Sequence, residues 1–134
     1  KDGSDYYVES GSFRLPWNRT TKKTCAEEET TIDEVGSIYT VQGFHLNYVG
    51  VILGPSVGYD RSTERLVLRP DAYCDTEAFR GKEGVSNVEY VKEQIILNSI
   101  NVLMKRGVKG LYVYAHDSAL REQLIKISSW KEKQ

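Results

Sequence analysis

The sequence predicts an α/β domain with a mostly parallel sheet flanked by helices, and three stretches lead to that prediction. Residues 48–53 form a near-continuous apolar run, which is typical of a strand covered on both faces. Residues 88–103 place apolar side chains at helical spacing, and residues 111–114 form a second apolar strand. Strand, crossover helix and strand in this order indicate a parallel pair with a right-handed connection.

The other predicted elements are shorter. Gly11 closes a strand at residues 6–11, whereas Pro16 argues against a regular element at residues 13–18. A short strand at 37–40 precedes a turn or short helix at 41–46. The stretches that follow are predicted as a surface hairpin at 59–69, a polar loop at 70–84 and a final helix at 119–130.

Polar residues mark both ends of the long helix. Ser86 and Glu89 fit a capping box, in which the serine accepts from a backbone amide and the glutamate reaches back. Lys105 and Arg106 fall in the predicted last turn, and Gly107 is a suitable residue just past the helix end. We therefore expect the helix to stop before Gly107.

Two clusters of ionisable residues have simple structural explanations. The consecutive carboxylates of residues 27–34 predict a solvated helix or loop, because a metal site needs carboxylates that converge from different elements. His116 and Asp117 follow a strand and could form a catalytic pair, but capping of the final helix by Asp117 or Ser118 is the favoured interpretation.

Composition places the chain among ordinary globular domains. Its 134 residues are 40% hydrophobic and 28% charged with a net charge of −1, which excludes a disordered chain and gives no support to a strongly basic nucleic-acid clamp. We expect one domain over residues 1–134, with an irregular lead-in at 1–30 and the α/β core at 31–134. The chain does not begin with Met and reads as part of a longer protein.

The cysteines and the hydropathy lead to a prediction about where in the cell the protein is located. Cys25 and Cys74 lie far apart and lack the paired spacing of a zinc site, so we interpret them as reduced thiols in a cytoplasmic protein. No apolar run approaches the roughly 20 residues of a membrane span, and we expect no membrane partner.

A basic cluster near the amino terminus is interleaved with aromatic residues. Arg14 and Arg19 lie on either side of Trp17. Such an arrangement can hold a single nucleic-acid strand by charge and stacking. The simpler alternative is a solvated loop with an anchoring tryptophan.

Thr40, Gln42 and Gly43 form the first segment with chemical potential. If a strand ends at Thr40, the hydroxyl and amide groups project at the carboxyl edge of a sheet, where they suit phosphate oxygens or a ribose. The alternative is a tight turn at Gly43 beside a solvated glutamine.

Lys105 and Arg106 form the second segment. Cations in a last helical turn are favoured by the helix dipole, by about 0.3–1 kcal/mol. The functional interpretation is an arginine finger at Arg106, which would stabilise charge on a γ-phosphate held by a partner lobe.

Together the two segments carry a family resemblance. Thr-Val-Gln-Gly-Phe at 40–44, followed by an apolar strand, resembles motif V of superfamily 1 helicases. Arg106-Gly107, followed by another apolar strand, resembles their motif VI. More closely, the chain resembles the Schlafen group 3-like DNA/RNA helicase domains, with residues 13–18, 38–55 and 98–114 as the matching stretches.

This resemblance implies a three-layer, RecA-like second lobe of a P-loop NTPase, with a β-hairpin or loop insertion. It implies Arg106 as the finger, Gln42, Gly43, Thr40 and Lys105 at the nucleotide edge, and Thr40 and His45 as contacts to single-stranded DNA or RNA. His45 stands where the family has an acidic residue, and Lys105 where it often has threonine. ATP and Mg²⁺ would be bound mainly by an N-terminal RecA-like lobe, because this sequence has no phosphate loop.

Three functional hypotheses follow. The first is the second motor lobe of an ATP-dependent helicase or nucleic-acid-dependent ATPase, inactive as a fragment. The second is a degenerate, non-catalytic module that binds nucleic acid or protein, favoured by His45 and Lys105. The third is an unrelated Rossmann-like domain that binds a mononucleotide at Gly43.

Overall fold

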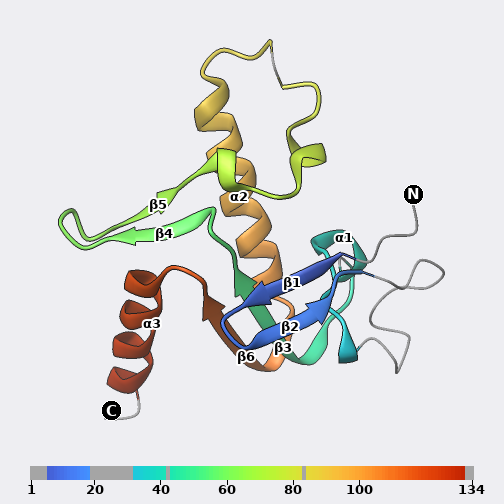
Figure 1. Cartoon of the computed structure of the whole chain (residues 1–134), viewed down its shortest axis with the longest axis vertical. Helices are drawn as coiled ribbons and strands as arrows, with labels where there is room; N and C mark the ends of the chain where they lie inside the picture. The colour runs from blue at the N-terminus through green and yellow to red at the C-terminus, as the bar shows by residue number, and fades with distance from the viewer. Residues whose placement is uncertain (1–5, 19–31, 42, 83, 132–134) are drawn as a thin grey trace.

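The computed structural model of the chain describes residues 6–18, 32–41, 43–82 and 84–131. Within these residues, the helices α1, α2 and α3, the 3₁₀ helices η2 and η3 and the strands β1 to β6 include one parallel strand pair (Figure 1). None of the described helices has the length and hydropathy that a membrane crossing requires. In chain order the elements are β1 (Tyr7–Ser10), β2 (Phe13–Pro16), α1 (Ile38–Val41), β3 (Leu46–Leu53), β4 (Val57–Asp60), β5 (Arg65–Leu68), the 3₁₀ helices η2 (Pro70–Ala72) and η3 (Thr76–Phe79), α2 (Val88–Met104), β6 (Gly107–Ala115) and α3 (Ser118–Lys131).

The parallel pair consists of β3 and β6, and α2 leads directly into β6. Its register runs from Leu46 opposite Gly107 to Leu53 opposite Ala115, with one irregularity between Leu46 and Tyr48. This confirms the predicted parallel pairing and the helix that precedes the second strand. The pairs β1–β2 and β4–β5 are antiparallel. Within the described residues the parallel sheet therefore has two strands, and a mostly parallel sheet is not seen.

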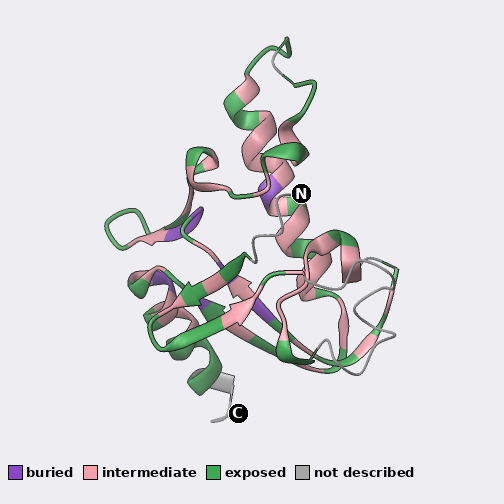
Figure 2. Ribbon diagram, turned by 45° about the vertical axis from the view of Figure 1, so that its right-hand side comes forward, coloured by how far each residue is buried: buried purple, intermediate pink, exposed green. Residues whose placement is uncertain are grey.

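The core lies on one face of the β3–β6 pair. Val51 and Leu53 of β3, Ala115 of β6 and Ile96 of α2 are buried there, and Ile96 is fully enclosed. Burying a side chain of this size stabilises the fold by about 1.5–3 kcal/mol. Figure 2 shows that the buried stretches are short and separate. The long helix is thus fixed to the sheet through its middle and last turns, since Ile100, Leu103 and Met104 also pack against this core.

The other face of the same pair is open toward its amino-terminal half. Tyr48 is 61% exposed and Tyr112 is 69% exposed, and the register puts both on one face, since Tyr48 lies opposite Gly110 and Gly50 opposite Tyr112. The prediction that residues 48–53 are covered on both faces is therefore wrong at Tyr48.

The β1–β2 hairpin occupies part of the predicted lead-in, and the prediction that Pro16 prevents a regular element is wrong. Trp17 N–H donates to the carbonyl of Tyr6 at 2.7 Å, so the next pair along the ladder, Tyr7 opposite Pro16, is not hydrogen-bonded. The nitrogen of Pro16 consequently faces away from β1, where its missing hydrogen costs no ladder bond. At the hairpin tip, Ser10 contacts Tyr114 of β6.

Two local predictions are also wrong. Residues 37–40 do not form a strand; a short helix, α1, spans Ile38–Val41, and both the amide and the hydroxyl of Thr40 donate to the carbonyl of Ser37. The capping box at the start of α2 is absent, because the N-cap is Asn87 in a left-handed conformation and Glu89 accepts from Lys92 at 2.9 Å. In both places, local side-chain contacts form instead of the hydrogen bonds that the sequence pattern predicted.

The surface hairpin predicted at 59–69 is confirmed as β4–β5, with its turn at residues 61–64. Arg69 then crosses back over Gly58, where an added Cβ would come within 2.6 Å of the Arg69 guanidinium. The absence of a side chain at Gly58 lets this arginine reach the end of β3.

Candidate functional site

Arg106 meets the start of β3, shortly after residues 40–43, at the amino ends of β3 and β6. The amide of Leu46, the first residue of β3, donates to the carbonyl of Arg106 at 2.9 Å. Leu46 also lies opposite Gly107, the first residue of β6. The predicted position at the carboxyl edge of a sheet is therefore wrong: α1 comes before β3, so the segment around Thr40 approaches the parallel pair from its amino end.

Arg106 holds a buried guanidinium nitrogen at this junction. Its amide donates to Leu103 at 3.2 Å, and its carbonyl accepts from Leu46. Its Nε is buried and has no hydrogen-bond partner within the described part of the chain. Leaving a buried donor unsatisfied costs about 1–3 kcal/mol, and more for a charged group. An acceptor supplied from elsewhere would therefore stabilise this side chain.

Lys105 and Gly107 flank the arginine in different roles. The helix ends at Met104 with Lys105 as an exposed C-cap, so Gly107 is not the residue that terminates it. Gly107 instead opens β6, and a Cβ there would collide with the carbonyl oxygen of Gly110. The glycine is needed for the strand irregularity that brings Arg106 beside Leu46.

The residues of α1 and the turn after it lead into β3, whose first residue contacts Arg106. Thr40 donates its hydroxyl to Ser37 at 2.8 Å, which leaves its oxygen lone pairs for a further contact. Gly43 adopts φ +93°, a conformation that favours glycine, and it makes the turn into β3. His45 is exposed just before β3. Gln42 lies outside the described residues.

Tyr39 links α1 to the loop after β5, a connection that the sequence did not reveal. The carboxylate of Asp75 raises the pKa of Tyr39 above its ordinary value of 10.0, and partial burial adds to the effect. Tyr73 and Glu77 contribute in the same direction. The loop between η2 and η3 therefore lies against the helix that carries Thr40.

Comparisons with known proteins identify the family to which the residues of this junction belong. A family model described as "Schlafen group 3, DNA/RNA helicase domain" matches residues 1–117 of the 134. The chain belongs to this family. The match contains the α1–β3 segment and the α2–β6 segment, which carried the resemblance in the sequence.

A relative from Saccharomyces cerevisiae is named "Uncharacterized protein YPL245W". It is 54% identical to this Schlafen group 3 domain over 131 residues, which are 95% of this chain and 29% of the relative. The chain thus spans less than a third of the length of that protein. No solved structure matches the chain.

The basic and aromatic cluster of this Schlafen group 3 domain is only partly available for binding. Arg14 pairs with Glu9 at 2.6 Å and stacks over the ring of Tyr7 at 3.9 Å. Trp17 is exposed and its backbone bridges to Val35, shortly before α1. The predicted contact residue Arg19 lies outside the described residues, as does Cys25; Cys74 is a free, exposed thiol.

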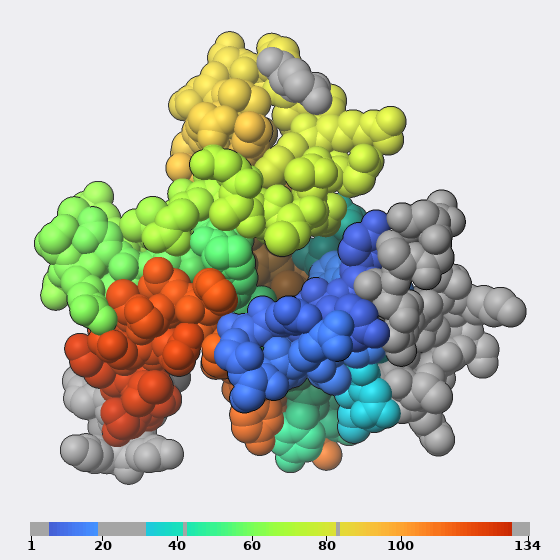
Figure 3. Space-filling model, in the orientation of Figure 1, coloured from blue at the N-terminus to red at the C-terminus, as the bar shows by residue number. Residues whose placement is uncertain are grey.

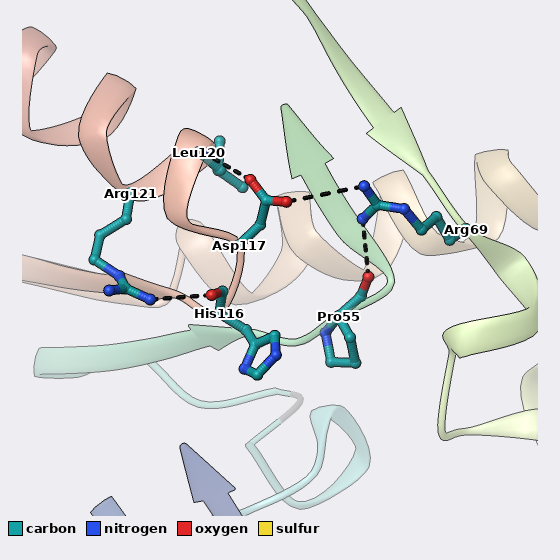
Figure 4. A network of polar contacts seen from close by, with 6 residues as sticks. All are labelled: Pro55, Arg69, His116, Asp117, Leu120 and Arg121. Atoms are coloured by element: carbon teal, nitrogen blue, oxygen red, sulfur yellow. Dashed lines mark hydrogen bonds and ion pairs between the residues drawn. The ribbon is translucent and has the colours of Figure 1, made fainter. Parts of the chain in front are cut away.

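A polar network at the carboxyl end of the parallel pair was not foreseen (Figure 4). Asp117 accepts from the amide of Leu120 at 2.9 Å, which confirms it as the cap of α3, and lies 3.8 Å from the Arg69 guanidinium. Arg69 also donates to the carbonyl of Pro55 at 3.1 Å. The network joins the β4–β5 hairpin to the start of α3.

His116 takes part in a separate contact, not in a pair with Asp117. Its Nδ1 lies 3.2 Å from the hydroxyl of Ser10, and its carbonyl accepts from Arg121 at 3.0 Å. Arg121 also donates to the carbonyl of Ala115 and lies over the ring of Tyr114. These contacts hold the hairpin tip and α3 against β6, so the structural interpretation of this stretch stands.

Proposed function

We propose that this Schlafen group 3 domain is the second, RecA-like lobe of an ATP-dependent DNA/RNA helicase or nucleic-acid-dependent ATPase, with Arg106 as its arginine finger. The observation that supports this most directly is the buried Nε of Arg106, which lacks a partner within the described residues, in a residue whose carbonyl accepts from the first amide of β3. A guanidinium suits an anion brought by a second lobe, because its planar fork pairs with two phosphate oxygens.

Mg²⁺ and ATP would be held mainly by an N-terminal RecA-like lobe of the longer protein. This sequence contains neither a phosphate loop nor an apolar strand ending in Asp-Glu. ATP bound there would supply the γ-phosphoryl group. Arg106 would offset the charge that grows during transfer, an effect worth about 10³–10⁵ in rate where such fingers have been removed.

Other residues at the junction would contact ligand without taking part in the chemistry. Thr40, Gln42 and Gly43 would line the nucleotide edge, and Lys105 would add an exposed positive charge to it. His45 and Thr40, with Trp17, Arg14 and Arg19, would face a single strand of DNA or RNA. Closure of the two lobes would then couple hydrolysis to movement along that strand.

A second candidate is a non-catalytic module that binds nucleic acid or protein. The exposure of His45 and Lys105, at the two positions where this sequence departs from the family pattern, favours it. It is also favoured because the Thr40 hydroxyl already donates to the carbonyl of Ser37, and because Arg14 already pairs with Glu9. An intact phosphate loop in the longer protein would support the motor, and its absence would support the module.

The decisive test is ATP hydrolysis by the longer protein carrying Arg106→Ala. We expect ATP affinity to stay within a few-fold and turnover to fall by about 10³ or more. Arg106→Lys should recover little, because lysine cannot pair bidentately. Arg61→Ala is the matched control, since Arg61 is an exposed arginine on the β4–β5 turn that pairs with Glu122. Equal turnover of wild type and Arg106→Ala would refute the finger.

A further inference from the structure

A pocket of about 550 Å³ lies between η3 and the first turns of α2. Figure 3 shows the amino-terminal half of α2 (gold) and the loop before it (yellow) side by side at the top of the molecule. This size falls within the roughly 300–1,000 Å³ that is common for ligand sites. Nothing in the proposed function uses it.

The lining of the pocket carries an excess of positive charge. Among the described residues, Arg80, Lys82 and Lys92 line it together with the carboxylate of Glu77, and Glu89 pairs with Lys92 from outside the lining. The chain as a whole has a net charge of −1, so the cations are a local concentration. An electropositive concave surface attracts polyanions, because a cleft focuses the field of the charges around it.

The carboxylates that pair with these cations could be replaced by a phosphate. Arg80 pairs with Glu77 at 3.2 Å, and both side chains are more than 70% exposed. Lys92 pairs with Glu89 at 2.9 Å. Pairs of this kind on a helix surface contribute little net free energy, so a phosphate could take over either cation at small cost.

An aromatic side chain completes the wall. The ring of Phe79 lines the pocket with Val88, and the Nζ of Lys92 lies 5.8 Å from the ring centroid. Tyr73 packs against this ring, with the two centroids 5.3 Å apart. Cations interleaved with an aromatic ring suit a single strand, whose phosphates meet the charges while a base meets the ring.

We propose that this pocket binds the sugar-phosphate backbone of single-stranded nucleic acid, with Arg80, Lys82 and Lys92 as phosphate contacts and Phe79 against a base. The choice of nucleic acid over another polyanion rests on the proposed function. The site is separate from Arg106, because the 17 residues of α2 put its two ends about 25 Å apart.

The test measures binding of a fluorescent single-stranded oligonucleotide by the 134-residue chain at several salt concentrations. The variant is Lys82→Gln with Lys92→Gln. The matched control is Arg61→Gln with Arg65→Gln, which removes the same charge from exposed positions on the β4–β5 hairpin. We expect the pocket variant to bind at least tenfold more weakly, and its log–log salt slope to fall by about 1.4, since each lost phosphate contact to a single strand removes about 0.7.

Other results of this test would contradict the proposal. Equal weakening in the pocket variant and the control, or no oligonucleotide binding by the wild type, would overturn the proposal. Competition by polyglutamate as strong as by unlabelled oligonucleotide would overturn the assignment to nucleic acid in favour of an acidic protein. The oligonucleotide measurement uses no substitution at Arg106, so a failed finger would appear in ATP turnover of the longer protein and leave this result unchanged.

Discussion

The ring of Tyr48 lies across Gly110 of the neighbouring strand, at the first regular pair after the irregularity in β6. A Cβ built on Gly110 would come within 2.7 Å of Tyr48 Cδ1. The close approach lies where the regular register of the parallel pair begins, three residues after Gly107. The glycine therefore helps to set the position of the ring.

Gly110→Ala should destabilise the fold by about 1–3 kcal/mol, because the added methyl group forces the Tyr48 ring away from the strand. The free energy of unfolding in urea measures this. Gly50→Ala is the control, since no atom lies within 4 Å of a Cβ at that position on the same pair. In the Tyr48→Ala background the cost of Gly110→Ala should largely vanish. Additive effects of the two substitutions would show that the ring contact is not the cause.

Asp117→Ala should cost about 0.5–2 kcal/mol of unfolding free energy, the usual value for loss of an N-cap. Asp117 accepts from Leu120 and lies near Arg69. Asp117→Asn keeps a capping oxygen and loses only the charge, so it should retain most of the stability. If urea denaturation finds alanine and asparagine equally destabilising, the ion pair with Arg69 matters more than the cap.

Asp60 should titrate below its ordinary value of 3.8, since the hydroxyl of Ser62 and then its amide donate to the carboxylate. A depressed folded-state pKa stabilises the fold above the unfolded value and loses that contribution as pH falls through the folded value. Ser62→Ala should raise the pKa of Asp60, as followed by the carboxyl ¹³C shift. Arg61→Ala leaves the hydroxyl in place and should change it less. An unmoved titration in Ser62→Ala would mean that the hydroxyl is not the dominant donor.

The raised pKa of Tyr39 should fall toward 10.0 in Asp75→Asn, because the carboxylate of Asp75 is the largest cause of the shift. The ring carbon that bears the hydroxyl reports this in an alkaline NMR titration. Asp71→Asn is the control, a carboxylate on η2 that does not contribute to the shift. A fall of the same size in both variants would show a general charge effect and not a contact between α1 and this loop.

The sequence predicted structural elements correctly where hydrophobic periodicity determines them. The β3–β6 pair, the helix α2 and the cap at Asp117 follow from apolar spacing and a well-placed carboxylate. The errors lie where local hydrogen bonds decide the conformation. Thr40 bonds to Ser37 and makes a helical turn, and Pro16 is tolerated because its nitrogen faces outward.

The members of the candidate site stay a prediction, whereas its predicted position was wrong. Arg106 contacts Leu46, the first residue of β3, at the amino ends of the strands, because α1 replaced the expected strand. Asp75, Gly110 and the pocket beside Phe79 left no pattern in the sequence, because each depends on a tertiary contact. Arg106 as a finger stays a prediction until turnover is measured.

The long helix α2 extends from the pocket beside Phe79 to the turn that carries Arg106. It runs 17 residues without proline or glycine, so it behaves as a stiff rod. A tilt of about 10° would displace one end relative to the other by about 4 Å. A strand bound at the loop beside Phe79 would thereby shift the turn that carries the guanidinium.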